Sequence, residues 1–170
     1  MKRVFALLIA LVLVTTACAS NSGDMDGVPE GVEATALSGP MAPNAEGIID
    51  IVERFFYLQF RELEFNQEAF LGQTIRYEGM FNTEFWVHGD AGGEYIHHVY
   101  RLTEPCCSPS EFVGLELYLG DFEAPEYNDW VQVTGVLDQI EDGGWFFLIL
   151  RVTDLVVLEE RGLEYINPGF

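Results

Sequence analysis

The chain has 170 residues, of which 28 are acidic and eight are basic, so its net charge at pH 7 is −20. A surface this acidic repels nucleic acid and anionic lipid head groups, which excludes a nucleic-acid partner. It would attract cations, although such a charge is also typical of an ordinary solvated surface that keeps a protein soluble.

The first 17 residues have the pattern of a lipoprotein signal peptide. Lys2 and Arg3 form a basic start, residues 5–14 are apolar without interruption, and small residues at 15–17 stand directly before Cys18. The apolar run is too short to span a bilayer, which takes about 20 residues. We expect cleavage before Cys18, whose thiol would carry diacylglycerol and anchor the chain in the cell membrane on its extracytoplasmic face. The alternative is an uncleaved signal anchor in which the cysteine is incidental.

Residues 18–46 are expected to form a flexible tether, and residues 47–170 a single domain. The tether is rich in Ser, Gly, Asn, Pro, Ala and acidic residues, and it has no sustained apolar period. Such a composition buries too little surface to offset the entropy of the chain. Removal of the signal leaves six arginines against 28 acidic residues, a net charge near −22. No second apolar run is long enough to cross a membrane, so the lipid would be the anchor.

The domain is predicted to be mainly β. Five segments alternate or are continuously apolar as strands do, and turn residues separate them. The last segment, 145–152, is apolar at nearly every position, which predicts a strand buried on both faces. Short connections, with Gly79 or Gly135 inside a strand where curvature is needed, favour a small five-stranded OB-fold barrel. A two-sheet sandwich is the alternative. The five predicted strands are Thr74–Asn82, Glu94–Leu102, Val113–Leu119, Trp130–Leu137 and Trp145–Val152.

Short helical turns are expected beside these strands. Residues 66–72 read as one capped turn closed by glycine, and residues 108–111 as a second. Residues 55–63 alternate in a way that favours a strand, whereas residues 48–55 fit a helical period better.

The cysteines other than Cys18 are the adjacent pair Cys106 and Cys107. Neighbouring cysteines close only a strained ring, because an unstrained disulfide places its Cα atoms more than about 4.4 Å apart. The pair is therefore a labile vicinal disulfide, two thiols or metal ligands. Together with His97 and Glu104 it forms a candidate site for zinc or another thiophilic metal. The alternative is that the thiols are partly buried structural residues.

The two neighbouring histidines must point to opposite faces of their strand. His98 shares a face with Ile96 and Tyr100, which predicts a packed side chain. His97 shares a face with Arg101 and is expected to be the more exposed, and so the better candidate for the site.

Several segments resemble the YcgQ-like family of two-component permease subunits. These are residues 70–81, the paired cysteines at 106–107, residues 113–115 and residues 129–137, and the resemblance covers about residues 66–160 in the same order. The resemblance implies an extracytoplasmic domain that accompanies a membrane permease. In this chain a lipid would replace the transmembrane helices that many members carry.

These observations favour a non-catalytic binding or accessory lipoprotein over an enzyme. The sequence has no Gly-x-Ser-x-Gly, His-Glu-x-x-His, phosphate-binding glycine loop or Cys-x-x-Cys. The alternative is a thiol-dependent redox protein or enzyme that uses Cys106 or Cys107, with His97 as the activating base.

Overall fold

A computed structural model describes residues 39–87, 93–105 and 109–168 of the protein. In these ranges the helical elements are 3-10 turns at Gly39–Met41 and Glu53–Phe55, α1 (Phe56–Phe65) and α2 (Gln67–Phe70). The strands are β1 (Ile48–Asp50), β2 (Thr74–Val87), β3 (Gly93–Thr103), β4 (Phe112–Tyr118), β5 (Trp130–Asp142), β6 (Trp145–Val157) and β7 (Tyr165–Ile166).

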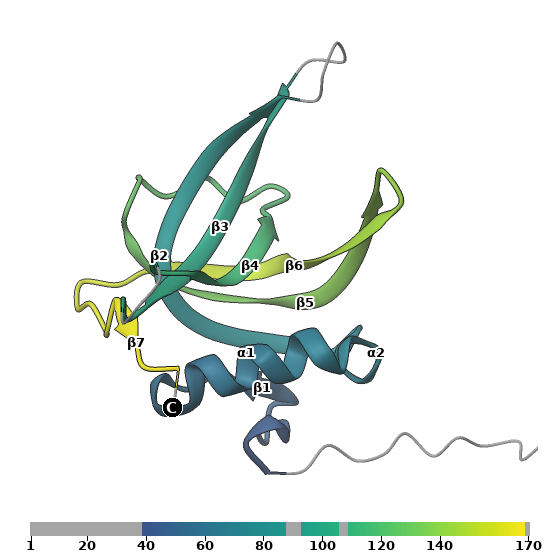
Figure 1. The fold of residues 1–170 in the computed structure, drawn as a ribbon, viewed down its shortest axis with the longest axis vertical. Helices are drawn as coiled ribbons and strands as arrows, with labels where there is room; N and C mark the ends of the chain where they lie inside the picture. Colours follow the sequence, from purple (N-terminus) through teal and green to yellow (C-terminus); the bar gives the residue numbers. More distant parts are fainter. Residues whose placement is uncertain (1–38, 88–92, 106–108, 169–170) are drawn as a thin grey trace, which may run out of the picture. The chain divides into compact units, whose positions relative to one another are not determined.

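Five of the strands close into a ring (Figure 1). Its order is β2–β5–β6–β4–β3, and pairing between β2 and β3 completes it. The ring pairs are antiparallel except β4 with β6, which are parallel. This is the five-stranded barrel of the OB fold, and the predicted fold class is confirmed. The short strands β1 and β7 add in parallel to β2 and β3, outside the ring.

Two glycines allow the strands to come close where the barrel curves, as the sequence predicted. A β-bulge at Thr153 of β6 lies opposite Thr134 and Gly135 of β5. A Cβ atom on Gly135 would lie 2.5 Å from the carbonyl oxygen of Arg151, and one on Gly79 would lie 2.7 Å from that of Tyr100. Real Cβ atoms do not approach so closely, so a larger residue at either position would push neighbouring strands apart.

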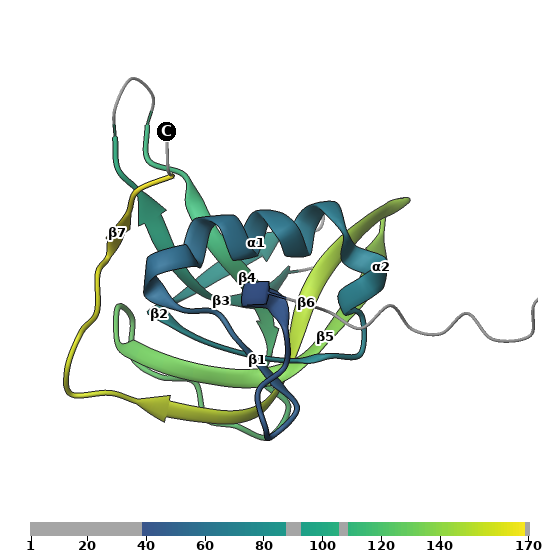
Figure 2. The ribbon, with the colours of Figure 1, turned by 90° about the horizontal axis from the view of Figure 1, so that it is seen from below.

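Helix α1 lies across one end of the barrel (Figure 2), and the sequence-based prediction of a strand at 55–63 is wrong. The buried side chains of α1 are Phe56, Gln59, Phe60 and Leu63, which follow the helical spacing i, i+3, i+4, i+7. The polar Gln59 interrupts the apolar stripe and conceals the helical period. The amide of Gln59 binds the backbone at the end of β1. Its Oε1 accepts a hydrogen bond from Val52 N–H at 2.9 Å, and its Nε2 donates one to the Asp50 carbonyl at 3.0 Å.

The chain before α1 also differs from expectation. Residues 48–55 are predicted to be helical, but they form β1, which pairs in parallel with β2, and then a 3-10 turn. Met41 is 6 % exposed within the core, so the folded part extends further toward the N-terminus than residue 47. Of the predicted turns, the one at 66–72 is confirmed by α2 and by Gly72, whose φ is 81°. Residues 109–111 are not helical.

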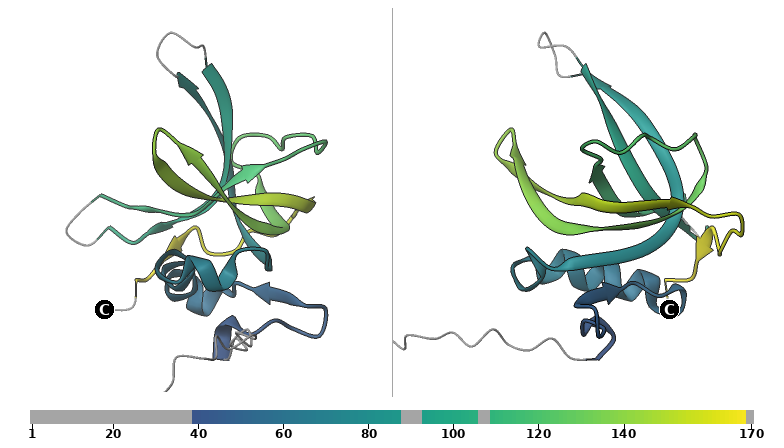
Figure 3. Two further views of the ribbon diagram at one scale, coloured as in Figure 1. Left: turned by 90° about the vertical axis from the view of Figure 1, so that its right-hand side faces the viewer. Right: turned by 180° about the vertical axis from the view of Figure 1, so that it is seen from behind.

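At the opposite end, the hairpins β2–β3 and β5–β6 extend beyond the ring and diverge as two arms (Figures 1 and 3). The start of β6 lies on one arm and is not buried, contrary to expectation. Trp145, Phe146 and Phe147 are 74, 62 and 47 % exposed. Burial explains the apolar run only from Leu148 to Val152, where the strand pairs in the ring and its apolar side chains are part-buried or buried.

Within the described residues, neither α1 nor α2 has the length and apolar character that a bilayer crossing requires.

Candidate functional site

A groove of about 310 Å³ lies on the outer face of the β2–β3–β4 part of the barrel. Each of these strands contributes two of the residues that line it. They are Asn82 and Glu84 from β2, His98 and Tyr100 from β3, and Phe112 and Gly114 from β4.

The register of the strands brings these side chains together. Asn82 is directly opposite His98, and Tyr100 is opposite Gly114. Because alternate residues of a strand share a face, all the lining side chains point away from the barrel interior. Gly114 leaves the middle of the groove without a side chain. A Cβ there would lie 2.1 Å from the Val99 carbonyl oxygen, so the close approach of β3 and β4 also requires glycine at this position.

The groove is acidic and carries no positive charge of its own. Burial lowers the pKa of His98, although Glu84 partly opposes this, so the imidazole is neutral at pH 7. The pKa of Tyr100 is raised by burial, and also by Tyr127, Glu84 and Glu164. Asn82 Nδ2 donates a hydrogen bond of 3.1 Å to Glu84 Oε1, which orients the carboxylate but leaves its charge.

The rings of Tyr100 and Phe112 form an aromatic corner of the groove. Their centroids are 4.6 Å apart and their planes are inclined at 60°. Phe112 is 64 % exposed, so one ring face remains available to a ligand. Two ring faces, a carboxylate, an amide and an imidazole are side chains that recognise small organic groups.

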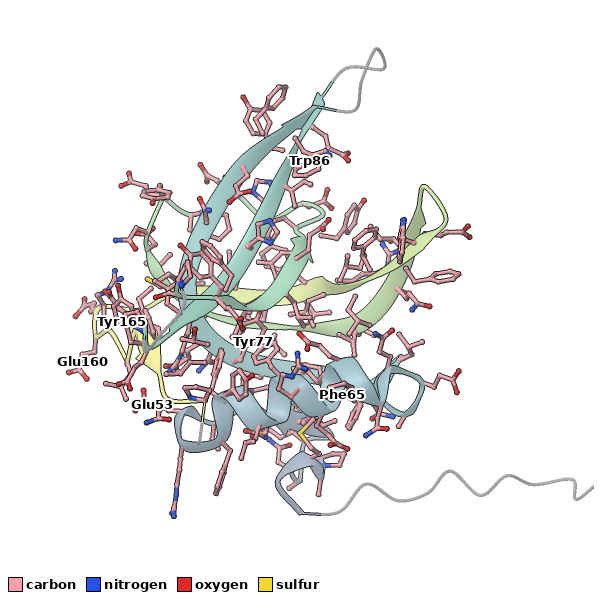
Figure 4. All side chains as sticks on the ribbon, in the orientation of Figure 1. Glu53, Phe65, Tyr77, Trp86, Glu160 and Tyr165 are labelled. Carbon is pink, nitrogen blue, oxygen red and sulfur yellow. The ribbon has the colours of Figure 1, made fainter. Side chains whose placement is uncertain are left out.

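Two other hollows lie elsewhere on the domain, and the first is lined by two ion pairs. One, of about 600 Å³, is lined by the pairs Arg76–Asp50 at 2.7 Å and Arg101–Glu53 at 3.1 Å. The other, of about 320 Å³, lies between the start of α1 and the C-terminal segment. Figure 4 shows Glu53 and Tyr165, which both line it, on the same side of the molecule.

The predicted site residue His97 lies on the inner face of β3, not on the exposed face. It shares this face with Val99 and Arg101, both of which are buried. Its ring stacks on Phe81 with centroids 5.7 Å apart, and its Nδ1 is 2.9 Å from Thr83 Oγ1. Burial lowers its pKa. The inward and outward faces of β3 are thus reversed relative to the prediction, because Arg101 is accommodated inside the barrel end.

Arg101 can point inward because aromatic rings and Glu53 receive it. Its guanidinium lies 4.6 Å from the Phe56 ring centroid and 4.9 Å from that of Trp130. Its Nε donates to the Glu78 carbonyl at 2.9 Å. Alternation alone treats arginine as an outward residue, so these contacts could not be anticipated from β3.

The structure does not bring Glu104 to His97. Glu104 is exposed just beyond β3, seven residues from His97, and a strand of that length spans about 23 Å. Cys18, Cys106 and Cys107 lie outside the described residues. Among the residues that are described, no three His, Cys, Asp or Glu side chains are grouped as metal ligands. The zinc site therefore remains a prediction that rests on the cysteine pair.

Sequence reasoning missed the groove, although it identified the strands that carry it. It treated His98 and Tyr100 as packed residues and gave no role to Asn82, Glu84 or Phe112. In the sequence, these residues occupy alternate positions of three consecutive strands, which places those of each strand on one face. Only the pairing register shows that the three sets lie side by side.

The sequence matches no model of a known protein family, and no curated protein is significantly similar to it.

Proposed function

We propose that this protein is a lipid-anchored, extracytoplasmic, non-catalytic binding module that serves a membrane partner such as a permease. The observation that carries the binding role is the groove on the β2–β3–β4 face, whose six lining residues come from three adjacent strands. The lipoprotein signal before Cys18 supports the location.

The position of the groove agrees with how OB folds are used. In the ring, β3 and β4 are the second and third strands, and OB folds bind ligands on this part of the barrel. This support is an analogy of fold, so the occupant must be inferred from the side chains themselves.

The anchor can be tested by expressing the full chain in a bacterium that is fed a palmitate analogue suitable for labelling. The wild-type protein should take up the label and sediment with membranes, whereas Cys18→Ala should remain unlabelled. Cys107→Ser serves as the matched cysteine control and should be labelled like the wild type. An unlabelled wild-type protein would refute the lipid anchor.

The binding role can be tested by a fragment screen, read by amide NMR, on the chain from Ser20 onward. We expect bound fragments to shift signals of the groove strands, and Phe112→Ser to abolish the effect. Tyr118→Ser is the control, because Tyr118 is on the same strand and is similarly exposed, at 57 %. Shifts confined to the β5–β6 arm would assign binding to a different surface.

Metal handling by Cys106 and Cys107 is a separate part of the proposal. Metal analysis of the purified protein, together with thiol titration, should find zinc or another thiophilic metal that Cys106→Ser and Cys107→Ser remove. A protein that neither retains nor binds zinc at micromolar concentration would eliminate this part and leave the groove unaffected.

A further inference from the structure

The positive side chains of the described residues are engaged away from the groove. The sequence has a single lysine, Lys2, so the domain has only arginines as permanent cations. Five of the six arginines pair with carboxylates elsewhere. These pairs are Arg61–Glu64, Arg76–Asp50, Arg101–Glu53, Arg151–Asp138 and Arg161–Glu164. The sixth, Arg54, lies over the Phe55 ring.

The groove lining consequently includes no arginine, and the pKa of its one basic side chain, His98, is lowered by burial. Among the described residues, Glu84 accepts a hydrogen bond from the neutral amide of Asn82. Glu116 stands opposite His98 across β3 and β4, and its pKa is raised by burial and by Glu94. A cation placed here would be attracted by these carboxylates.

The aromatic corner supplies the second component of a cation site. A positive head group above an aromatic ring is attracted by the electron-rich face of the ring. Tyr100 and Phe112 line the groove with two such rings, whose planes are inclined at 60°. The rings and the Glu84 carboxylate line the same groove, so a compact organic cation can contact a ring face and the carboxylate together.

We propose that the groove binds the head group of an organic cation, an alkylammonium or a guanidinium, against the accessible faces of the Tyr100 and Phe112 rings, with Glu84 as the counter-ion. The inference rests on the proposed function only in taking the groove as the ligand surface. The same head group occurs in free amines and in the side chains of basic peptides. An anion is disfavoured by the charge, and a neutral sugar would use the rings without needing the carboxylate.

Choline and its uncharged carbon analogue 3,3-dimethylbutanol provide a direct test, because they differ chiefly in charge. Titrations of the chain from Ser20 onward, followed by amide NMR, should show choline binding at the groove at least about tenfold more tightly than the analogue. Glu84→Gln should reduce the choline affinity by about tenfold and flatten its dependence on salt. Phe112→Leu should reduce it similarly, while Tyr118→Leu should leave it unchanged.

Arginine amide and a short arginine-containing peptide, each compared with its citrulline counterpart, distinguish the two sources. Stronger binding of the peptide indicates a protein partner, and equal binding indicates a free amine. The proposal is overturned if choline and its analogue bind equally, if Glu84→Gln has no effect, or if neither choline nor arginine amide shifts the groove. If neutral sugars shift these signals in place of the cations, the groove would still be a binding site, but the proposal that its ligand is a cation would be refuted.

Discussion

The two ends of the barrel differ in what their aromatic side chains do. At the end covered by α1, Phe56 and Phe60 meet Tyr77 edge to face, with centroids 6.1 and 5.1 Å apart, and all three are buried. At the end with the two arms, Trp86 and Trp145 project into solvent, as the position of Trp86 in Figure 4 shows. The aromatic side chains at the covered end thus stabilise the core, whereas those on the arms are exposed and do not. Large exposed apolar side chains in a group are a mark of surfaces that contact other molecules.

The largest effect should come from the covered end. Phe60→Ala removes a buried ring from the contact between α1 and Tyr77, and it should lower the free energy of unfolding by about 3–5 kcal/mol. Phe65→Ala is the matched control on the same helix, because Phe65 is 73 % exposed and touches only Arg61 among the ring contacts. Chemical denaturation should separate the two variants clearly. Equal losses would mean that α1 does not pack on the barrel as described.

Tyr77→Phe should have the next largest effect. The Tyr77 hydroxyl donates to the Val99 carbonyl at 3.0 Å and accepts from Leu115 N–H at 3.2 Å, so it joins β3 and β4 from inside the barrel. Its removal leaves two buried backbone groups without a partner, at about 1–3 kcal/mol. The measurement is again chemical denaturation, and hydrogen exchange at Leu115 should accelerate most. No change at Leu115 would contradict the role of the hydroxyl.

Glu53→Gln should have a smaller effect that depends on pH. Glu53 accepts from Leu163 N–H and pairs with Arg101, and these contacts lower its pKa below the usual 4.5. Since the lowered pKa belongs to the folded state, the stabilisation is complete above about pH 5 and is lost as the pH falls through the lowered value. We expect a loss of about 1 kcal/mol at pH 7, because Glu53 is itself half-exposed. The difference from wild type should shrink toward pH 3 in thermal melts, and a difference independent of pH would show that charge is not involved.

The smallest effect on stability should come from the arms. Trp145→Ser combined with Phe146→Ser should change the free energy of unfolding by less than about 0.5 kcal/mol, since both side chains are exposed. The same change should reduce self-association in light scattering, because it removes apolar surface. Leu150→Ala is the control in the same strand, and it should destabilise by about 2–5 kcal/mol because Leu150 is fully buried. A large destabilisation by the arm variant would mean that the arm belongs to the core.

The barrel was predictable from the sequence because each strand can be recognised from its own residues. Alternation in β2 and β4 correctly identified inward residues such as Tyr77 and Leu115, and turn residues separated the strands. The prediction failed where a polar residue is buried, as Gln59 in α1 and Arg101 in β3 are. It also failed in β6, where the apolar Phe146 is exposed. Gln59 and Arg101 are buried because residues from other elements bind them, and Phe146 is exposed because no other element among the described residues covers it. The residue pattern of a single element does not contain this information.

The candidate site was less predictable than the fold. The groove depends on the register that sets Asn82 against His98 and Tyr100 against Gly114, and no single strand contains that information. The sequence instead directed attention to residues with reactive side chains. Of these, His97 proves to be stacked inside the barrel, and Glu104 lies just beyond the C-terminal end of β3.

The strand order of the ring also determines when its parts can form as the chain is made. Residues 149–151 of β6 are the neighbours that β4 needs to close the ring, so closure must wait until nearly the whole chain is available. The strands β2, β3 and β4 are consecutive and pair through short-range antiparallel contacts, which form faster than distant ones. The face that carries the groove can therefore be assembled by the emerging chain before a barrel exists, and the surface proposed to bind a ligand belongs to the earliest part of the sheet to be completed.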